Sequence, residues 1–424
     1  MSGSKPLDDV FLTNPDFSIH AVDEAVPAAL ALAAVPVPAP PLAPSLGPLA
    51  AFSGTFVGKG FNTIFRPDSK VTPTPMPGPV NTTDPADNVL ELNLTDETLS
   101  FSNALGSVPN RGSETQADVF LNGIPYLQTV NDITSGKAIG IHLEPGIWLA
   151  VPPTSNPSVP VMTVARMASI PHGTTIMAQG VALAAIAGKP TLHPVDITPF
   201  LGGNPNSPIR FQNQTVTNKT TRRIPQDLTA LNAQGRITQG ILDDPNSLLR
   251  NQIANQTITQ TIVIEISTKP GSPLVRGPLP AGNHPSAPGF GGGPANIAFL
   301  LGQANPPPGG PKSNANAFQM DALFLIETVV YDIQVPPLPA GSAPVILDPV
   351  QKGSVPLVPS FIASVPFIPG KKFAGGVVKV ATIQIQYSQK VMLDFSGLTW
   401  PHVSVASLVP AAPIPIPEHL LPMT

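Results

Sequence analysis

The chain has 424 residues, which suffices for one large β-domain or for two domains. Charged residues make up 11% of it, against roughly 25% in ordinary globular proteins, and the net charge is −4. Without clustered lysine and arginine to replace counterions along a phosphate backbone, nucleic acid is excluded as a partner. The absence of cysteine excludes disulfides, thiolate metal sites and cysteine nucleophiles.

Proline is the most informative part of the composition. The chain contains 56 prolines and 35 glycines, so long helices are excluded from most of it. Strands joined by proline- and glycine-rich loops are the natural alternative, and a closed barrel removes the edge strands that promote aggregation. The composition therefore predicts an all-β protein, with a large antiparallel barrel, long loops and few short helices.

Residues 1–48 are predicted to form an arm, with a short helix followed by an extended segment rich in proline and alanine. The apolar stretch at 25–51 contains seven prolines, so it does not read as a membrane span, which needs about 20 consecutive apolar residues. Because arms of this kind often pack on a neighbouring subunit, we expect a homo-oligomer. The first residues lack the basic and apolar regions of a signal peptide, which favours a cytoplasmic location.

Three stretches in the first part of the chain alternate with the period of a strand, at residues 51–65, 88–101 and 117–130. The first carries glycines at every second or fourth position, at Gly54, Gly58 and Gly60. Glycine weakens a strand unless a bend or a close backbone approach requires it. These glycines are typical of a strongly curved opening strand of a barrel.

The stretch from 139 to 180 concentrates the polar chemistry of the chain. It is predicted to form three strands, at 141–151, 159–168 and 174–180, separated by proline and glycine. It also holds one of the two tryptophans and several polar side chains, namely His142, Glu144, Trp148, Arg166 and His172.

The second half of the chain is less regular at first and then returns to strands. Helices are predicted at 227–235 and 243–255, the second capped by Asp243 or Asp244. Strands are predicted at 258–267, 295–302, 318–335, 377–395 and 400–408. The resulting organisation is the arm at 1–48, a single barrel domain at 49–408 with an insertion around 181–375, and a proline-rich tail at 409–424.

Four short motifs follow one another in the order in which nitrobindins carry them. They are GTFVGKG at 54–60, ETLSF at 97–101, HLEPGIW at 142–148, and a strand with Tyr387 followed by HVSVASL at 402–408. Over about residues 45–180 and 375–408 the chain resembles the nitrobindin group of the calycin superfamily, with Phe56 where that group has tryptophan. Nitrobindins are much shorter, so the resemblance says little about residues 181–375.

The resemblance implies a barrel that binds heme b, with the late histidine as the ligand of the iron. That role falls on His402, and Trp400 and Tyr387 are candidates to line the cofactor. On a strand, Trp400, His402, Ser404 and Ala406 share one face, where the small residues leave room for a flat ligand. The alternative is a histidine held in the core or on the surface by hydrogen bonds.

Two further pairs of residues have a catalytic and a structural interpretation. His142 and Glu144 lie two residues apart on one strand, so they can orient a base or a bound group, or Glu144 can bind backbone amides at the Pro145 bend. Arg166 and His172 suit peroxide activation beside a heme. Alternatively, Arg166 is buried against a carboxylate such as Glu144, Asp118 or Glu327.

These observations predict binding of heme or another apolar small molecule inside a barrel, with peroxidase-type activity as an extension of heme binding. The alternative is a non-catalytic structural or self-assembling protein, favoured by the uncharged surface and by the apolar arm at 25–51.

Overall fold

A computed structural model describes residues 44–68, 74–76, 88–156, 158–170, 173–269, 293–296, 315–350, 353 and 355–422. The chain divides into two units, 1–42 and 43–424. The predicted N-terminal helix and most of the arm lie outside the described residues. No helix in the described part of the chain has the length and apolar character needed to span a membrane.

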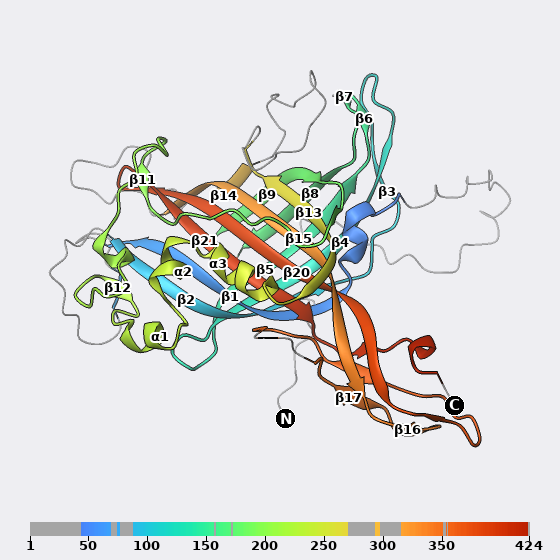
Figure 1. Ribbon diagram of the computed structural model, residues 1–424. Helices are drawn as coiled ribbons and strands as arrows, with labels where there is room; N and C mark the ends of the chain where they lie inside the picture. Colours follow the sequence, from blue (N-terminus) through green and yellow to red (C-terminus); the bar gives the residue numbers. More distant parts are fainter. Residues whose placement is uncertain are drawn as a thin grey trace, which may run out of the picture. The chain divides into compact units, whose positions relative to one another are not determined.

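Ten strands form a closed antiparallel barrel, which confirms the predicted fold class (Figure 1). Each strand pairs with the next, and the last one pairs with the first. In spatial order they are β1 (Gly54–Pro67), β2 (Asn88–Phe101), β4 (Val119–Asp132), β5 (Ile139–Val151), β8 (Thr163–Ile170), β9 (Thr174–Ala182), β13 (Thr257–Ser267), β15 (Asn316–Val335), β20 (Gly376–Phe395) and β21 (Leu398–Pro410). Two of these strands, β13 and β15, come from the region predicted as an insertion.

Shorter elements decorate the barrel. The helices in the described residues are α1 (Thr229–Ala233), α2 (Gln239–Asp243) and α3 (Asn246–Ile253), with 3-10 turns η3 (Gly47–Ala51), η4 (Gln212–Gln214) and η5 (Glu418–Leu420). The short strands are β3 (Val108–Asn110), β6 (Thr154–Ser155), β7 (Ser158–Val159), β10 (Ile186–Ala187), β11 (Phe200–Leu201), β12 (Arg223–Ile224), β14 (Gly293–Asn296), β16 (Leu338–Pro339), β17 (Val345–Leu347), β18 (Phe361–Ala363), β19 (Lys372–Phe373) and β22 (Ile414–Pro415).

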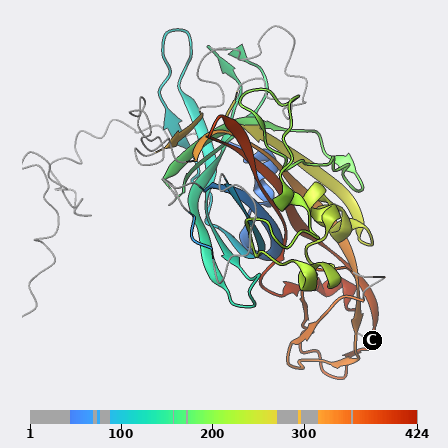
Figure 2. The same cartoon turned by 90° about the vertical axis from the view of Figure 1, so that its left-hand side faces the viewer.

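The helices lie on one side of the barrel, and β4 and β5 lie on the other (Figure 2, yellow-green and teal). The helix predicted at 243–255 is α3, which begins after Pro245, whereas α2 is not among the predicted helices. Asp244 accepts a hydrogen bond from the backbone N–H of Asn246 at 3.1 Å, at the start of α3. Asp244 therefore binds the first turn of α3, although the N-cap position itself is Pro245, which makes no side-chain cap.

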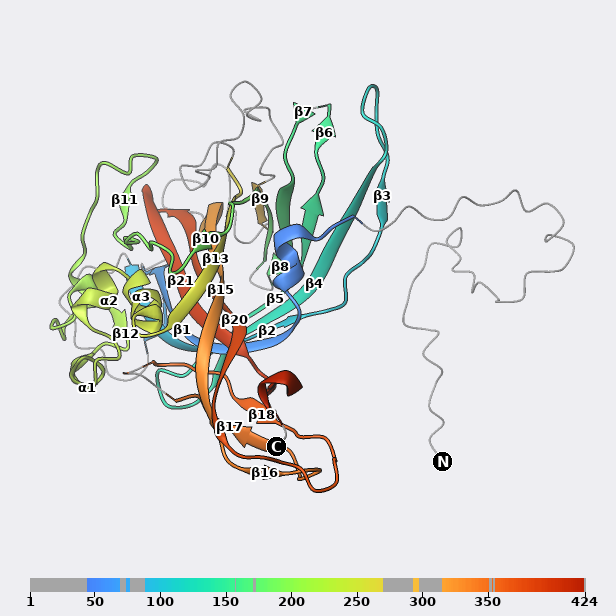
Figure 3. The same cartoon turned by 45° about the vertical axis from the view of Figure 1, so that its right-hand side comes forward.

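The barrel interior contains an aromatic cluster that closes one end. Leu49 and Phe52, from η3 and the residue after it, are buried against Phe101 and Trp148, with the two phenylalanine rings stacked at 4.7 Å. Figure 3 shows the turn η3 (blue) beside β5. Trp148 also meets Phe324 edge-on at 5.0 Å. This end of the interior is therefore a packed core.

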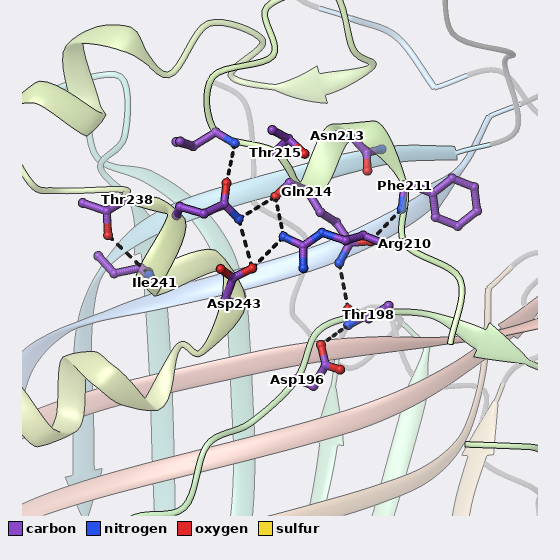
Figure 4. Close-up of polar contacts among 12 residues, drawn as sticks. Asp196, Thr198, Arg210, Phe211, Asn213, Gln214, Thr215, Thr238, Ile241 and Asp243 are labelled. Carbon is purple, nitrogen blue, oxygen red and sulfur yellow. Dashed lines mark hydrogen bonds and ion pairs between the residues drawn. The ribbon is translucent and has the colours of Figure 1, made fainter. Parts of the chain in front are cut away.

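A second apolar cluster lies between the barrel and the segments that cover its outer face. Phe61 and Phe65 of β1 and Leu92 of β2 are fully buried in it, together with Leu242 and Leu249 of the helices. Polar contacts fix the covering segment, including a 2.6 Å ion pair between Arg210 and Asp243 (Figure 4). The outer face of this half of the barrel is therefore buried as part of a hydrophobic core.

The segment at 411–421, within the range predicted as a proline-rich tail, packs on the same unit. It contains β22, which pairs with β18 in parallel, and the turn η5. Ile416 and Leu421 are buried in the outer cluster, so these residues extend the apolar covering of the barrel.

Candidate functional site

On β1 and β21, the side chains that point out of the barrel are more buried than those that point into it. This is the reverse of the usual arrangement. On the outward faces, Phe61, Val403 and Val405 are at most 1% exposed, because the outer cluster covers them. On the inward faces, Asn62 and Ser404 are only half-buried. The inward side chains at this end of the barrel, hereafter called the hollow end, are therefore partly accessible to solvent, whereas those at the opposite end are packed.

Polar side chains line this hollow end in a connected chain. The Asn62 amide donates to the Ser404 hydroxyl at 2.8 Å, and the Asn93 amide donates to the Asn62 carbonyl at 3.3 Å. Arg66 and the half-buried Glu91 form an ion pair of 2.9 Å at the rim. Amide, hydroxyl and ionic groups are thus held on neighbouring strands around one opening.

His402 has the same parity on β21 as Ser404, two residues later, and is half-buried. Its Nδ1 donates to the backbone carbonyl of Thr63 at 2.8 Å. Since a carbonyl only accepts, Nδ1 carries the proton in this bond. This bond fixes both the tautomer and the orientation of the ring.

The predicted pairing of Arg166 with a buried carboxylate is confirmed for Glu144. The two side chains are almost fully buried, and Nη2 lies 2.5 Å from Oε1. Glu144 also accepts from the hydroxyl of Tyr126 and lies 3.2 Å from Nε2 of His142. Burial alone would raise the pKa of Glu144, but the charge of Arg166 and the bonds from His142 and Tyr126 lower it to about 2.

Each nitrogen type of Arg166 has a protein partner. Nε donates to the Tyr126 hydroxyl at 2.8 Å, Nη1 donates to Gln389 at 2.7 Å and Nη2 binds Glu144. The rings of Tyr126, Trp148 and Phe324 surround the guanidinium at 5.2–5.8 Å from its central carbon. Gln389 is half-buried, so it connects the buried ion pair to the hollow end.

A second carboxylate lies beneath the hollow end. The Tyr387 hydroxyl donates to Glu97 at 2.6 Å, Thr95 donates at 2.7 Å and Gln128 at 3.2 Å. Burial raises the pKa of Glu97, although these three bonds oppose the rise. The interior thus holds two carboxyl groups in different environments, one paired with arginine and one bound by neutral donors.

The remaining predicted site residues lie elsewhere. Trp400 is 1% exposed and belongs to the outer cluster, where its ring packs on Phe395 at 4.5 Å, on Phe65 at 5.1 Å and on Phe211 at 5.3 Å. It is enclosed by protein and does not line the hollow end, although it precedes His402 by two residues. His172 lies outside the described residues.

Among the residues with described positions, no group of three or more His, Asp or Glu side chains is arranged to hold a metal ion. The polar face of β2 contributes most to the site beyond the predicted residues. Its members recur at every second position, as Glu91, Asn93, Thr95 and Glu97. That recurrence is visible in the sequence, where polar residues at one parity of a strand are usually assigned to solvent.

Comparisons with known proteins add little to this geometry. No family model matches the chain, and no curated protein matches it. The crystal structure of Rv2717c from M. tuberculosis aligns over 88% of this chain and 99% of that chain, with 10% sequence identity and a TM-score of 0.31. At that TM-score the likeness carries no argument about this chain.

Proposed function

We propose that the protein binds a small, largely apolar molecule at the hollow end of the barrel. The observation that carries this proposal is the reversed burial on β1 and β21, where Val403 and Val405 are buried outside while Asn62 and Ser404 are half-buried inside. A barrel that served only as a scaffold would gain stability by filling its interior with branched apolar side chains. A concave space with a few fixed polar groups is typical of a ligand site.

Heme b is the specific ligand that we propose, in agreement with the resemblance in sequence. The donor chemistry of His402 fits it, because a neutral imidazole oriented by a carbonyl at Nδ1 is a common axial ligand of heme iron. His402 would hold the iron, and Tyr387 and His142 belong to the surrounding polar groups. Heme, when bound, supplies an iron that can take up diatomic gases or peroxide.

Arg166 supports the site as a positioning residue. A distal arginine in peroxide chemistry stabilises charge on the bound oxygen, whereas this guanidinium already donates to Tyr126, Gln389 and Glu144. Its exposure is 2%, and three aromatic rings surround it. These contacts favour a role in holding Gln389 and Glu144 in place over direct contact with a ligand.

The test is an absorption spectrum of the purified protein after titration with hemin. We expect a Soret band with one heme per chain, lost in His402→Ala and retained in the control His419→Ala, which removes an exposed histidine on η5. A second variant, Ser404→Phe, fills the hollow end without touching His402 and should prevent binding of heme and of a fluorescent apolar probe alike.

The outcomes separate the two levels of the proposal. Probe binding that Ser404→Phe abolishes, without any Soret band, would retain the apolar-ligand site and remove heme. Absence of both signals in the folded wild-type protein would overturn the ligand-binding proposal and leave the structural role as the better account.

A further inference from the structure

The outward face of β4, β5, β8 and β9 is an apolar surface without charge. Interior residues such as Tyr126, Trp148 and Ala178 fix which parity points inward, so the alternate residues point outward. The central members of this surface, hereafter the apolar face, are Pro125, Leu127, Leu143, Pro145, Ile147, Leu149, Met167 and Met177. They neighbour one another across the strands and form a continuous lattice.

Exposure on the apolar face is high for side chains of this type. Leu127 and Leu143 are each 43% exposed and Met177 is 47% exposed. Antiparallel sheets with one face in water normally carry polar residues on it. The described outward positions of these four strands hold no Asp, Glu, Lys or Arg, and Thr98 and Ser100 of β2 continue the face as a polar rim that ends at the exposed Asp96.

The other half of the same barrel shows how the protein treats an apolar outer face. There, helices and loops bury Phe61, Leu92 and Val405 in the outer cluster. The apolar face lies on the opposite side of the barrel from these helices (Figure 2, teal). Burial of one outer half within the chain, while the other half stays open, indicates that something outside the described residues covers the second half.

The properties of the apolar face indicate which partner covers it. A surface without charge can meet its own copy without like-charge repulsion, and a two-fold axis makes such a contact self-complementary. Four strands over seven residues span about 19 Å by about 23 Å, or about 440 Å² in projection. That is about half of the ~800 Å² that each partner contributes to a standard interface, so with the rim on β2 the contact is at the small end of specific interfaces.

We propose that the apolar face is a dimer interface, in which β4, β5, β8 and β9 of two copies pack face to face. Aligned sheets pack with side chains interdigitated about 10 Å apart, and Leu, Ile and Met side chains suit that spacing. The interface is on the outer side of the barrel, so dimer formation leaves the hollow end and its His402 accessible.

The first experiment measures the molar mass of the full-length protein by light scattering over a concentration series. We expect a dimer in the wild type, and a rise in the dissociation constant of at least ~30-fold in Leu143→Lys and in Met177→Lys. The matched control is Ile346→Lys, which places the same charge on a residue that is 62% exposed on β17, away from the apolar face. This control should dimerise like the wild type.

The second experiment uses the absence of cysteine in the chain. Leu127→Cys is expected to give covalent dimers with a short bismaleimide, and Ile346→Cys is not. This cross-linking experiment keeps the proposal testable even if the lysine variants fail to fold. A monomeric wild type at every concentration, unaltered dimerisation in both folded lysine variants, or cross-linking at position 346 in place of 127 would each overturn the proposal.

Discussion

At the scale of single residues, Glu327 on β15 is the least expected side chain in the protein. It is fully buried beneath the helices, and one carboxyl oxygen accepts from Gln384 at 2.6 Å. The other oxygen has no hydrogen-bond partner within the described residues. Burial raises the pKa of Glu327 from 4.5 to about 7, and the single bond from Gln384 opposes the rise only in part.

The raised pKa predicts that Glu327 destabilises the fold at neutral and alkaline pH. The folded protein holds this proton more tightly than the unfolded chain does, so stability falls as pH rises from about 4.5 to about 7 and stays constant above that. The free energy of unfolding is therefore about 3 kcal/mol lower above pH 7 than below pH 4.5. When the free energy of unfolding is measured by chemical denaturation at pH 5 and pH 8, Glu327→Gln should not show this fall. Asp96→Asn, at an exposed position on β2, should show it as the wild type does. An unchanged pH dependence in the glutamine variant would contradict the argument.

The ion pair between Glu144 and Arg166 has the opposite effect on the pH dependence of stability. Because the pKa of Glu144 is lowered from 4.5 to about 2, its contribution is complete above pH 4.5 and is lost as pH falls toward 2. Arg166→Met leaves a buried carboxylate without its cation and should cost about 3–5 kcal/mol at pH 7. The double variant Arg166→Met with Glu144→Leu should recover most of that loss in urea denaturation. Equal losses in the single and double variants would show that the pair does not act as a unit.

At the scale of elements, the glycines of β1 explain how the barrel closes. A Cβ built on Gly58 would lie 1.9 Å from the carbonyl oxygen of Ser407, and one on Gly60 would lie 2.3 Å from that of Val405. Both oxygens are backbone atoms of β21, so neither can move without moving the strand. The close approach of two strands is therefore the reason for glycine here, as the sequence pattern indicated.

This geometry predicts that Gly58→Ala destabilises the protein by more than about 3 kcal/mol, because overpacking against backbone has no side-chain escape. The control is Gly240→Ala in α2, where the nearest atom to a new Cβ is 3.8 Å away. That change should be neutral or should raise stability by up to about 1 kcal/mol, since alanine favours helix. Thermal unfolding of the two variants compares them directly. Similar melting temperatures for both would remove the close-approach argument.

Period-two alternation is a local property, which explains what could be read from the sequence. It located the strands at 258–267, 318–335 and 377–395 almost to the residue, because each covers 10 to 20 alternating positions. It also placed Trp400 and His402 on one parity. It could not show that Phe211, from a loop almost 190 residues earlier, encloses Trp400 and removes it from the site. Contacts of that separation depend on the complete fold.

At the scale of the whole molecule, the barrel has two cores that serve different purposes. The interior cluster closes one end around Trp148 and Phe52. The outer cluster covers β1, β2 and β21 from outside and holds residues from the helices to η5. Because the outer cluster supports these strands, their inward faces are relieved of packing and can carry Asn62, Glu91 and Ser404. The large covering segments thus make a hollow, polar end compatible with a stable barrel.

This division predicts that stability and ligand binding respond to opposite faces of the same strands. Leu92→Ala removes a fully buried outward side chain of β2 and should cost about 2–5 kcal/mol, with little change in ligand affinity. Asn62→Ala, on the inward face of β1, loses two hydrogen bonds beside solvent and should cost at most about 1–2 kcal/mol. Its effect should fall on ligand affinity instead. Chemical denaturation and ligand titration of both variants test this separation, and a larger stability loss in Asn62→Ala than in Leu92→Ala would mean that the interior, and not the outer cluster, supports the barrel.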